Sequence, residues 1–337
     1  MKSLFTTILC LSVCCLFSQN SDSAHFYFNK GLEGKDARLF AIAGKNFDKA
    51  IQFNQNYTEA YIENGKVNLE MRKIDAAMGN FVKAYQLKPD NNEIARELSN
   101  LYFNNRQFQK AIDFSQKCGS SPGVERVMGM SYYNLEDYGK AVIFLQKAIG
   151  KNDKDAESYY TLGRTYLELE NEKNAIPQFQ KAIALESSRN VWMYELGLIY
   201  YNQEDYADAL KYFNMAGAAG YNKMNDFYEN AGFAQLYTGD IQNGIKTLDV
   251  IMQRKPNNKE LLTNIAQAMY DTKHYDEAIN YYEKLLTLNP KDAQALFMAG
   301  MTFQKKGDKQ KGQKICDKAI EMDPSLASHR QKQELPM

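Results

Sequence analysis

The chain has 337 residues, of which 44% are hydrophobic, and its 41 basic side chains balance 41 acidic ones, so the formal net charge at pH 7 is zero. This composition is ordinary for a folded, soluble protein. Affinity for a nucleic-acid backbone requires clustered excess positive charge, and the balance therefore excludes a general nucleic-acid binder.

The first residues, "MKSLFTTILCLSVCCLFSQNS", have the organisation of a secretory signal peptide. Lys2 precedes an apolar stretch from Leu4 to Phe17, and small and polar residues follow at Ser18. Such a stretch is short for a bilayer span and typical of a signal h-region. We therefore predict a signal peptide over residues 1–18, a short linker over 19–23, and export to the periplasm or the outside of the cell, with no integral membrane segment after signal removal.

Two alternatives for this leader remain open. It could stay attached as an uncleaved anchor, or the chain could be a lipoprotein modified at Cys14 or Cys15. Lipid attachment needs a small residue before the cysteine, whereas Val13 and Cys14 occupy those positions. The leader resembles those of exported Bacteroidetes proteins.

Outside the leader the sequence lacks the signatures of a metal, cofactor or catalytic site. Cys118 and Cys316 are about 200 residues apart, there is no CxxC motif, and the three histidines share no ligand spacing. The segment "GLEGKD" has too few residues between its glycines for a phosphate loop. No nucleophile elbow or triad pattern is present. We predict a non-catalytic protein without metal or cofactor.

The body of the chain repeats with a period of 34 residues. The steps between successive small residues are 34, 34, 30, 34, 34, 35, 34 and 34, and these residues are Gly31, Gly65, Ser99, Gly129, Gly163, Gly197, Gly232, Ala266 and Gly300. Such self-similarity indicates a repeat array, in which each unit must bury its apolar face against its neighbours.

A second column of small residues lies 12 positions after the first, at Ala43, Ala77, Ala111, Ala141, Ala175, Ala209, Gly244, Ala278 and Gly312. Bulky rings follow this column by four residues, at Phe47, Phe81, Phe179, Phe213 and Tyr282. Large residues packed against small ones produce dense interiors. Each period therefore predicts one helical hairpin whose two helices approach closely.

The pattern resembles the tetratricopeptide repeat. The fifth unit, "YYTLGRTYLELENEKNAIPQFQKAIAL", matches the signature of that repeat except at its closing proline, where Ser187 stands. The resemblance implies an all-α superhelical solenoid of about nine helix-turn-helix repeats over residues 24–325, followed by a polar tail over 326–337. Irregular spacing predicts weaker junctions near 118–124 and 217–226.

The family resemblance also implies that the first helix of each hairpin lines a binding groove, and that the residues three before and one, four and five after the first small column face it. We selected arginines, tyrosines and an asparagine of the third to sixth repeats as candidate partner-binding residues, since arginine and tyrosine are common anchors. They are Arg96, Asn100, Arg126, Tyr133, Tyr160, Arg164, Tyr194 and Tyr201.

Alternatively, the arginines are solvated and the tyrosines only complete the packing between repeats. The carboxylate clamp known in this family is not expected, because Val127 stands where its second asparagine should be. We predict a non-catalytic protein–protein interaction scaffold of the cell envelope whose partner is a protein or peptide segment, possibly acidic because of the arginines. A glycan- or peptidoglycan-binding adaptor, or an accessory subunit of an envelope secretion or assembly machine, is the alternative.

Overall fold

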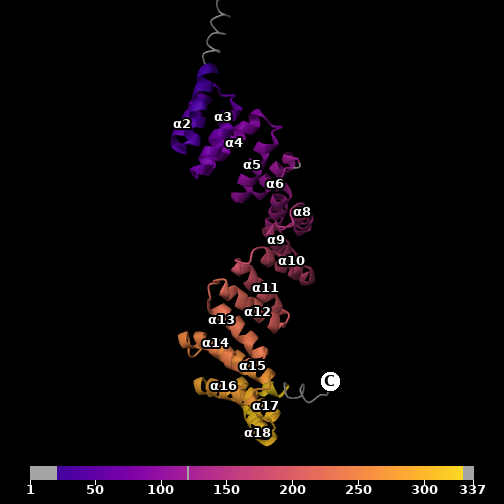
Figure 1. Ribbon diagram of the computed structural model, residues 1–337. Helices are drawn as coiled ribbons and strands as arrows, with labels where there is room; N and C mark the ends of the chain where they lie inside the picture. The colour runs from indigo at the N-terminus through magenta and orange to yellow at the C-terminus, as the bar shows by residue number, and fades with distance from the viewer. Residues whose placement is uncertain (1–20, 120, 329–337) are drawn as a thin grey trace, which may run out of the picture. The chain divides into compact units, whose positions relative to one another are not determined.

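The computed structural model describes residues 21–119 and 121–328, and these segments contain helices and turns but no strand. The chain divides into two compact units, the first ending at Leu185 and the second beginning at Glu186. Figure 1 shows the helices of each unit stacked in chain order. The predicted all-α repeat fold is confirmed. The boundary between the units lies at neither of the weaker junctions that the spacing predicted, and those two junctions stay predictions.

The first unit consists of antiparallel helical pairs. Its helices are residues 21–36, α2 (Phe40–Phe53), α3 (Thr58–Glu70), α4 (Ile74–Leu87), α5 (Asn92–Asn104), α6 (Phe108–Ser115) with the 3-10 turn η1 (Gln116–Cys118), α7 (Val124–Asn134), α8 (Tyr138–Lys151), α9 (Ala156–Glu168) and α10 (Glu172–Leu185). The short α6 lies in the repeat whose spacing is four residues shorter than the others.

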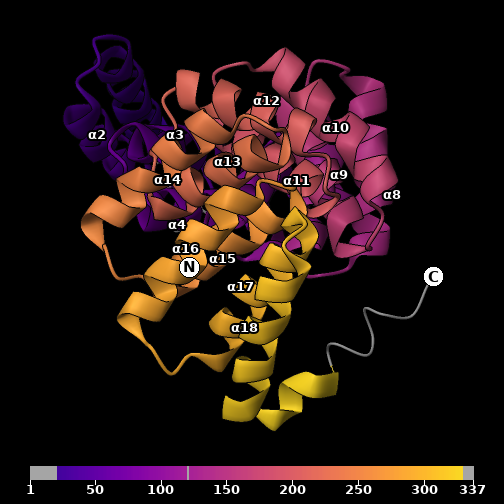
Figure 2. The ribbon, with the colours of Figure 1, turned by 90° about the horizontal axis from the view of Figure 1, so that it is seen from below.

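The second unit continues the same alternation. Its helices are α11 (Asn190–Asn202), α12 (Tyr206–Ala218), α13 (Asn225–Tyr237), α14 (Ile241–Arg254), α15 (Lys259–Asp271), α16 (Tyr275–Leu288), α17 (Ala293–Lys306) and α18 (Lys309–Met322), followed by the 3-10 turn η2 (Pro324–Leu326). Figures 1 and 2 both show α17 and α18 side by side. We call the helix over 21–36 and the odd-numbered helices the first helices, and the even-numbered ones the second helices.

The two small columns lie where the helices of one hairpin meet. A methyl group on Gly163 would lie 2.7 Å from Cδ2 of Phe179, and one on Gly197 would lie 2.6 Å from Cδ1 of Phe213. Both phenylalanines are fully buried. The predicted close packing of rings against glycines is therefore confirmed, and it offsets the lower helix propensity of glycine.

Buried polar groups at exceptional positions of the columns are paired. Ser99 replaces the glycine of the third repeat, and its hydroxyl donates to the carbonyl of Ala111 at 3.1 Å and lies 2.6 Å from the hydroxyl of Ser115. These bonds satisfy the polar group, since an unpaired buried hydroxyl would destabilise the fold.

Many helices begin at a side-chain cap. An aspartate carboxylate accepts a hydrogen bond from a backbone amide of the first turn at α8, α9, α12, α14, α17 and α18, and the residues are Asp137, Asp155, Asp205, Asp240, Asp292 and Asp308. Capping satisfies amides that have no partner inside the helix.

Every hairpin turn contains one residue with left-handed backbone, which the sequence pattern did not reveal. Their φ values lie between 53° and 112°, and the residues are Arg38, Arg72, Arg106, Glu136, Glu170, Glu204, Gly239, Lys273 and Gly307. The amide after each such residue bonds back across the turn, for example from Gln107 to the carbonyl of Tyr102 at 2.8 Å. This geometry ends the first helix as a Schellman motif, and charged residues adopt it at seven of the nine turns.

Candidate functional site

The predicted partner-binding residues all lie on first helices, but in different units. Arg96 and Asn100 lie on α5, Arg126 and Tyr133 on α7, and Tyr160 and Arg164 on α9, whereas Tyr194 and Tyr201 lie on α11 of the second unit. The structure describes each unit by itself, so the candidate residues form two separate groups.

In the first unit, Tyr133, Tyr160 and Arg164 come together. The guanidinium carbon of Arg164 is 5.5 Å from the ring centre of Tyr133 and 5.9 Å from that of Tyr160. The ring of Tyr160 in turn packs edge-on against Phe179 at 5.5 Å. Cation–π contacts of this kind hold the cation over the rings, so this part of the first-helix face is an ordered cationic and aromatic surface.

Arg126 is engaged within the chain. Its side chain forms ion pairs with Asp155, at 3.5 Å, and with Glu157. Asp155 also caps α9, so Arg126 connects α7 to the beginning of the next first helix. Arg96 lies 3.4 Å from its neighbour Glu97. The charge of Arg126 is thus largely compensated, which the sequence did not indicate because the acids lie about 30 residues away.

In the second unit, Tyr194 is a packing residue. Its side chain is only 6% exposed, and its ring stacks on Tyr221 at 4.4 Å and contacts Phe213 and Phe227. Asn230 donates a hydrogen bond to its hydroxyl at 3.0 Å. The contribution of Tyr194 to partner binding is therefore to support the wall of the surface, because little of its ring is open to a ligand.

Tyr201 lines a pocket that we call the first-helix pocket. The pocket has a volume of about 230 Å³ and is lined by Tyr201, Glu229, Asn230, Phe233, Tyr237, Asn264 and Gln267, which belong to α11, α13 and α15. Of these, only Tyr201 was selected from the sequence. The groove positions that the family implies, applied to the seventh and eighth repeats, would have found Glu229, Phe233, Tyr237 and Gln267. Asn230 and Asn264 lie two residues before the small column, outside that rule.

Burial and negative charge dominate the electrostatics of this pocket. Burial raises the pKa of Glu229, and the neighbouring carboxylates Glu260 and Asp226 raise it further. The pKa of Tyr201 is raised by burial first and then by Tyr206, Tyr237 and Glu229. Both shifts show that an additional negative charge is unfavourable at this site.

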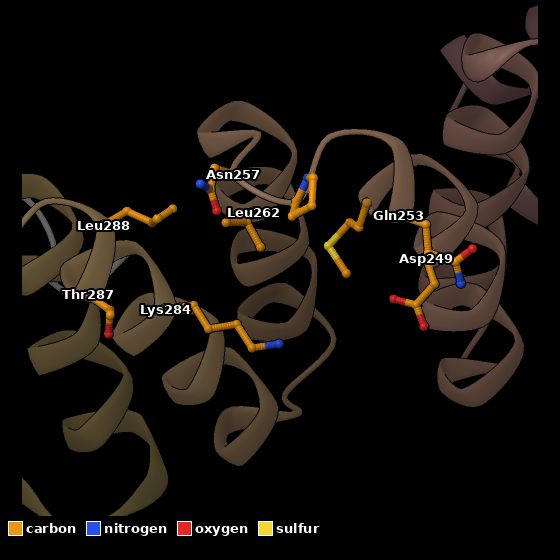
Figure 3. A pocket seen from close by; sticks show the side chains of 9 residues that line it. Asp249, Gln253, Asn257, Leu262, Lys284, Thr287 and Leu288 are labelled. Atoms are coloured by element: carbon orange, nitrogen blue, oxygen red, sulfur yellow. The ribbon is translucent and has the colours of Figure 1, made fainter.

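A larger pocket lies on the other side of the hairpins, among second helices. It has a volume of about 450 Å³ between α14, α16 and the start of α15, and it is lined by Asp249, Met252, Gln253, Pro256, Asn257, Leu262, Lys284, Thr287 and Leu288. In Figure 3 the side chains of Asp249 and Lys284 extend toward the space between them. The ammonium of Lys284 lies 4.3 Å from the ring centre of Tyr281. The walls carry one charge of each sign, so this pocket does not favour a ligand of either charge.

The buried tyrosines predict alkaline sensitivity of the second unit. Burial raises the pKa of Tyr194 to about 12, whereas an unfolded tyrosine titrates near pH 10. The stabilising contribution is complete below about pH 10 and is lost as the pH rises toward about 12, because the folded state holds the proton more tightly. Urea unfolding at several alkaline pH values should show this decline, and Tyr194→Phe should reduce its slope. An unchanged slope in that variant would contradict the assignment.

No group of three or more histidine, cysteine, aspartate or glutamate side chains within residues 21–119 and 121–328 is placed to hold a metal ion. In the same part of the chain no helix combines the length and apolar character that a bilayer crossing requires. The signal-peptide prediction falls on residues 1–18, which lie outside the described residues.

Comparison with protein families identifies the repeat. Models described as "Tetratricopeptide repeat" match residues 126–190 and 160–223, residues 259–292, and residues 293–326. Together with the helical hairpins of 34 residues, these matches show that the chain contains tetratricopeptide repeats. Each unit is a tetratricopeptide-repeat solenoid.

Individual proteins resemble parts of the chain. RNA polymerase II-associated protein 3 of Rattus norvegicus is 33% identical over 79 residues, which are 23% of this chain and 11% of the rat protein. A crystal structure of MamA shares 24% identity over 46% of this chain and 93% of that one, with a TM-score of 0.44. YrrB, described as a tetratricopeptide-repeat protein with an unusual peptide-binding site, shares 25% identity over 56% of this chain and 97% of that one, with a TM-score of 0.41.

Proposed function

We propose that this chain is a non-catalytic protein–protein interaction scaffold of the cell envelope, which binds a partner segment on the surface of its first helices. The tetratricopeptide fold is typically an interaction scaffold and not an enzyme. The observation that carries the proposal is the first-helix pocket. Side chains of three successive first helices line it, and they combine aromatic rings with amides that can bond an extended backbone.

The envelope location rests on the leader. Lys2, the apolar stretch to Phe17 and Ser18 have the order of a signal peptide. Removal of residues 1–18 would release the repeat array into the periplasm or the medium.

For the first unit we propose an acidic partner segment. The support is Arg164, which lies over the rings of Tyr133 and Tyr160, a combination that suits a carboxylate beside apolar contact area. The compensated Arg126 is not the main anchor of this surface.

Site-specific crosslinking in intact cells tests these proposals together. A photoreactive residue in place of the exposed Asn264 or Asn134, both on first helices, should form adducts with a protein segment. The same residue in place of Lys318, exposed on α18, is the control and should form few. Mass spectrometry should place the amino terminus of the crosslinked protein near Gln19 and an acidic segment at Asn134.

Equal adduct formation at all three positions would contradict binding on the first helices. Adducts that carry carbohydrate in place of peptide would favour the glycan-binding alternative, and an intact Met1 would contradict export through a cleaved leader.

A further inference from the structure

The first helices around the first-helix pocket carry a marked excess of negative charge. In α11, α13 and α15 the acidic residues outnumber the basic ones by five to one, and they are Glu195, Asp226, Glu229, Glu260 and Asp271 against Lys259. Within the described chain, Asp226, Glu229 and Glu260 form no ion pair with a lysine or arginine. This local charge is unlike that of the chain as a whole, which is neutral.

Glu229 is the carboxylate that lines the pocket itself. It is partly buried, and two further carboxylates, Glu260 and Asp226, act on it electrostatically. A carboxylate that loses hydration without gaining a partner destabilises the protein. A cation in the pocket would compensate this charge, and a charge-assisted hydrogen bond there would be stronger than one on an open surface.

Aromatic rings form another wall of the pocket. Tyr201 and Tyr237 line it, and Tyr206 links them, because its ring stacks on Tyr237 at 4.4 Å and meets Tyr201 edge-on at 5.3 Å. The faces of aromatic rings attract cations and also accept the aliphatic part of a long side chain.

Amides complete the lining. Asn230 donates to the hydroxyl of Tyr194, which leaves its side-chain oxygen as an acceptor, and Asn264 and Gln267 supply further acceptors from α15. An ammonium or guanidinium group has several donors to satisfy and no acceptor of its own. The pocket therefore offers carboxylate, amide and ring acceptors for the same kind of group.

The pocket is also the size of a side chain. Its volume of about 230 Å³ is below the range of about 300–1,000 Å³ that is usual for sites of whole small molecules. We propose that the first-helix pocket binds a lysine or arginine side chain of the partner segment, with Glu229 as its ion-pair partner and Tyr201 and Tyr237 along its stem. This inference rests on the proposed function and specifies the chemistry of the partner at that surface.

Peptide binding to the full chain tests the inference. Four fluorescent peptides of equal length and common backbone sequence would carry lysine, arginine, glutamine or glutamate at alternate positions, and anisotropy would report their dissociation constants. The lysine and arginine peptides should bind at least about tenfold more tightly than the glutamine peptide, since one charge-assisted hydrogen bond contributes about 1.5–3 kcal/mol. The glutamate peptide should bind most weakly.

Glu229→Gln is the decisive variant, because it keeps the shape of the side chain and removes its charge. It should weaken binding of the lysine and arginine peptides by about tenfold and leave the glutamine peptide unaffected. Its midpoint of thermal unfolding should equal or exceed that of the parent, since a carboxylate with a raised pKa is removed, so lost binding cannot be attributed to unfolding. Asp249→Asn, which removes a carboxylate from the pocket among the second helices, is the matched control and should bind all peptides as the parent does.

The possible failures are distinct. If the glutamine peptide binds as tightly as the basic ones, or if Glu229→Gln and Asp249→Asn behave alike, the surface binds peptides without the proposed basic anchor and the inference is wrong while the proposed function stands. If none of the four peptides binds, both the inference and peptide binding at this surface are contradicted.

Discussion

Replacement of Phe213 by alanine should lower the free energy of unfolding by about 3–5 kcal/mol, the range for large-to-small substitutions of buried aromatic residues. The ring has no exposed surface and lies between the hairpin partner Gly197 and the rings of Tyr194 and Phe227. A cavity at this position removes contacts within the hairpin and with the next repeat. Chemical denaturation of the full chain, with hydrogen exchange to locate the loss in α11–α13, measures the effect.

A double-mutant cycle with Gly197 tests the packing directly. Gly197→Ala alone should destabilise, because the new methyl group would lie 2.6 Å from Cδ1 of Phe213. Phe213→Ala removes that obstacle, so the double variant should be more stable than the sum of the single effects predicts. Phe53→Ala, at a ring that is 41% exposed, is the control for loss of a ring and should have a much smaller effect. Strict additivity in the cycle would contradict the proposed contact.

Gly312→Ala should destabilise α17 and α18 although it adds a single methyl group. The new carbon would lie 2.5 Å from the carbonyl oxygen of Gly300 and 2.7 Å from the amide nitrogen of Gln304. Both are backbone atoms, which cannot rotate away as a side chain would, so the two helices must separate. Overpacking of this kind typically costs about 1–3 kcal/mol, occasionally more, and a thermal or urea melt would measure it.

Gly79→Ala is the matched control for this substitution. Gly79 lies within α4 and is exposed, and a methyl group there would meet nothing within 4 Å. Alanine should raise stability by up to about 1 kcal/mol through its greater helix propensity. Opposite signs for the two variants are expected, whereas a gain at both positions would mean that α17 and α18 do not approach as closely as the structure shows.

The sequence by itself was sufficient to predict the helical hairpins. Residues such as Gly163 and Ala175 recur at fixed positions because each hairpin repeats the same contact between neighbouring helices. That contact joins residues close together in the chain, so a single period contains the information. The ring that fills the space, Phe179, lies in the same period, and the tetratricopeptide signature includes all three positions.

The tertiary structure decided which candidate side chains remain open to a partner. Arg126 pairs with Asp155 and Glu157, and Tyr194 is covered by Tyr221 and Phe227, because each of these contacts joins different repeats. The left-handed residues of the turns also escaped prediction, since arginine, glutamate and lysine occupy most of them in place of glycine.

The first-helix pocket likewise exists only in three dimensions. Asn230 and Asn264 share its lining although they are 34 residues apart, and Glu229 gains its electrostatic neighbours from α13 and α15 together. Residue types within one period predict the hairpin. The stacking of α11, α13 and α15 determines which of their side chains meet, because only that stacking brings polar groups of separate repeats to one site.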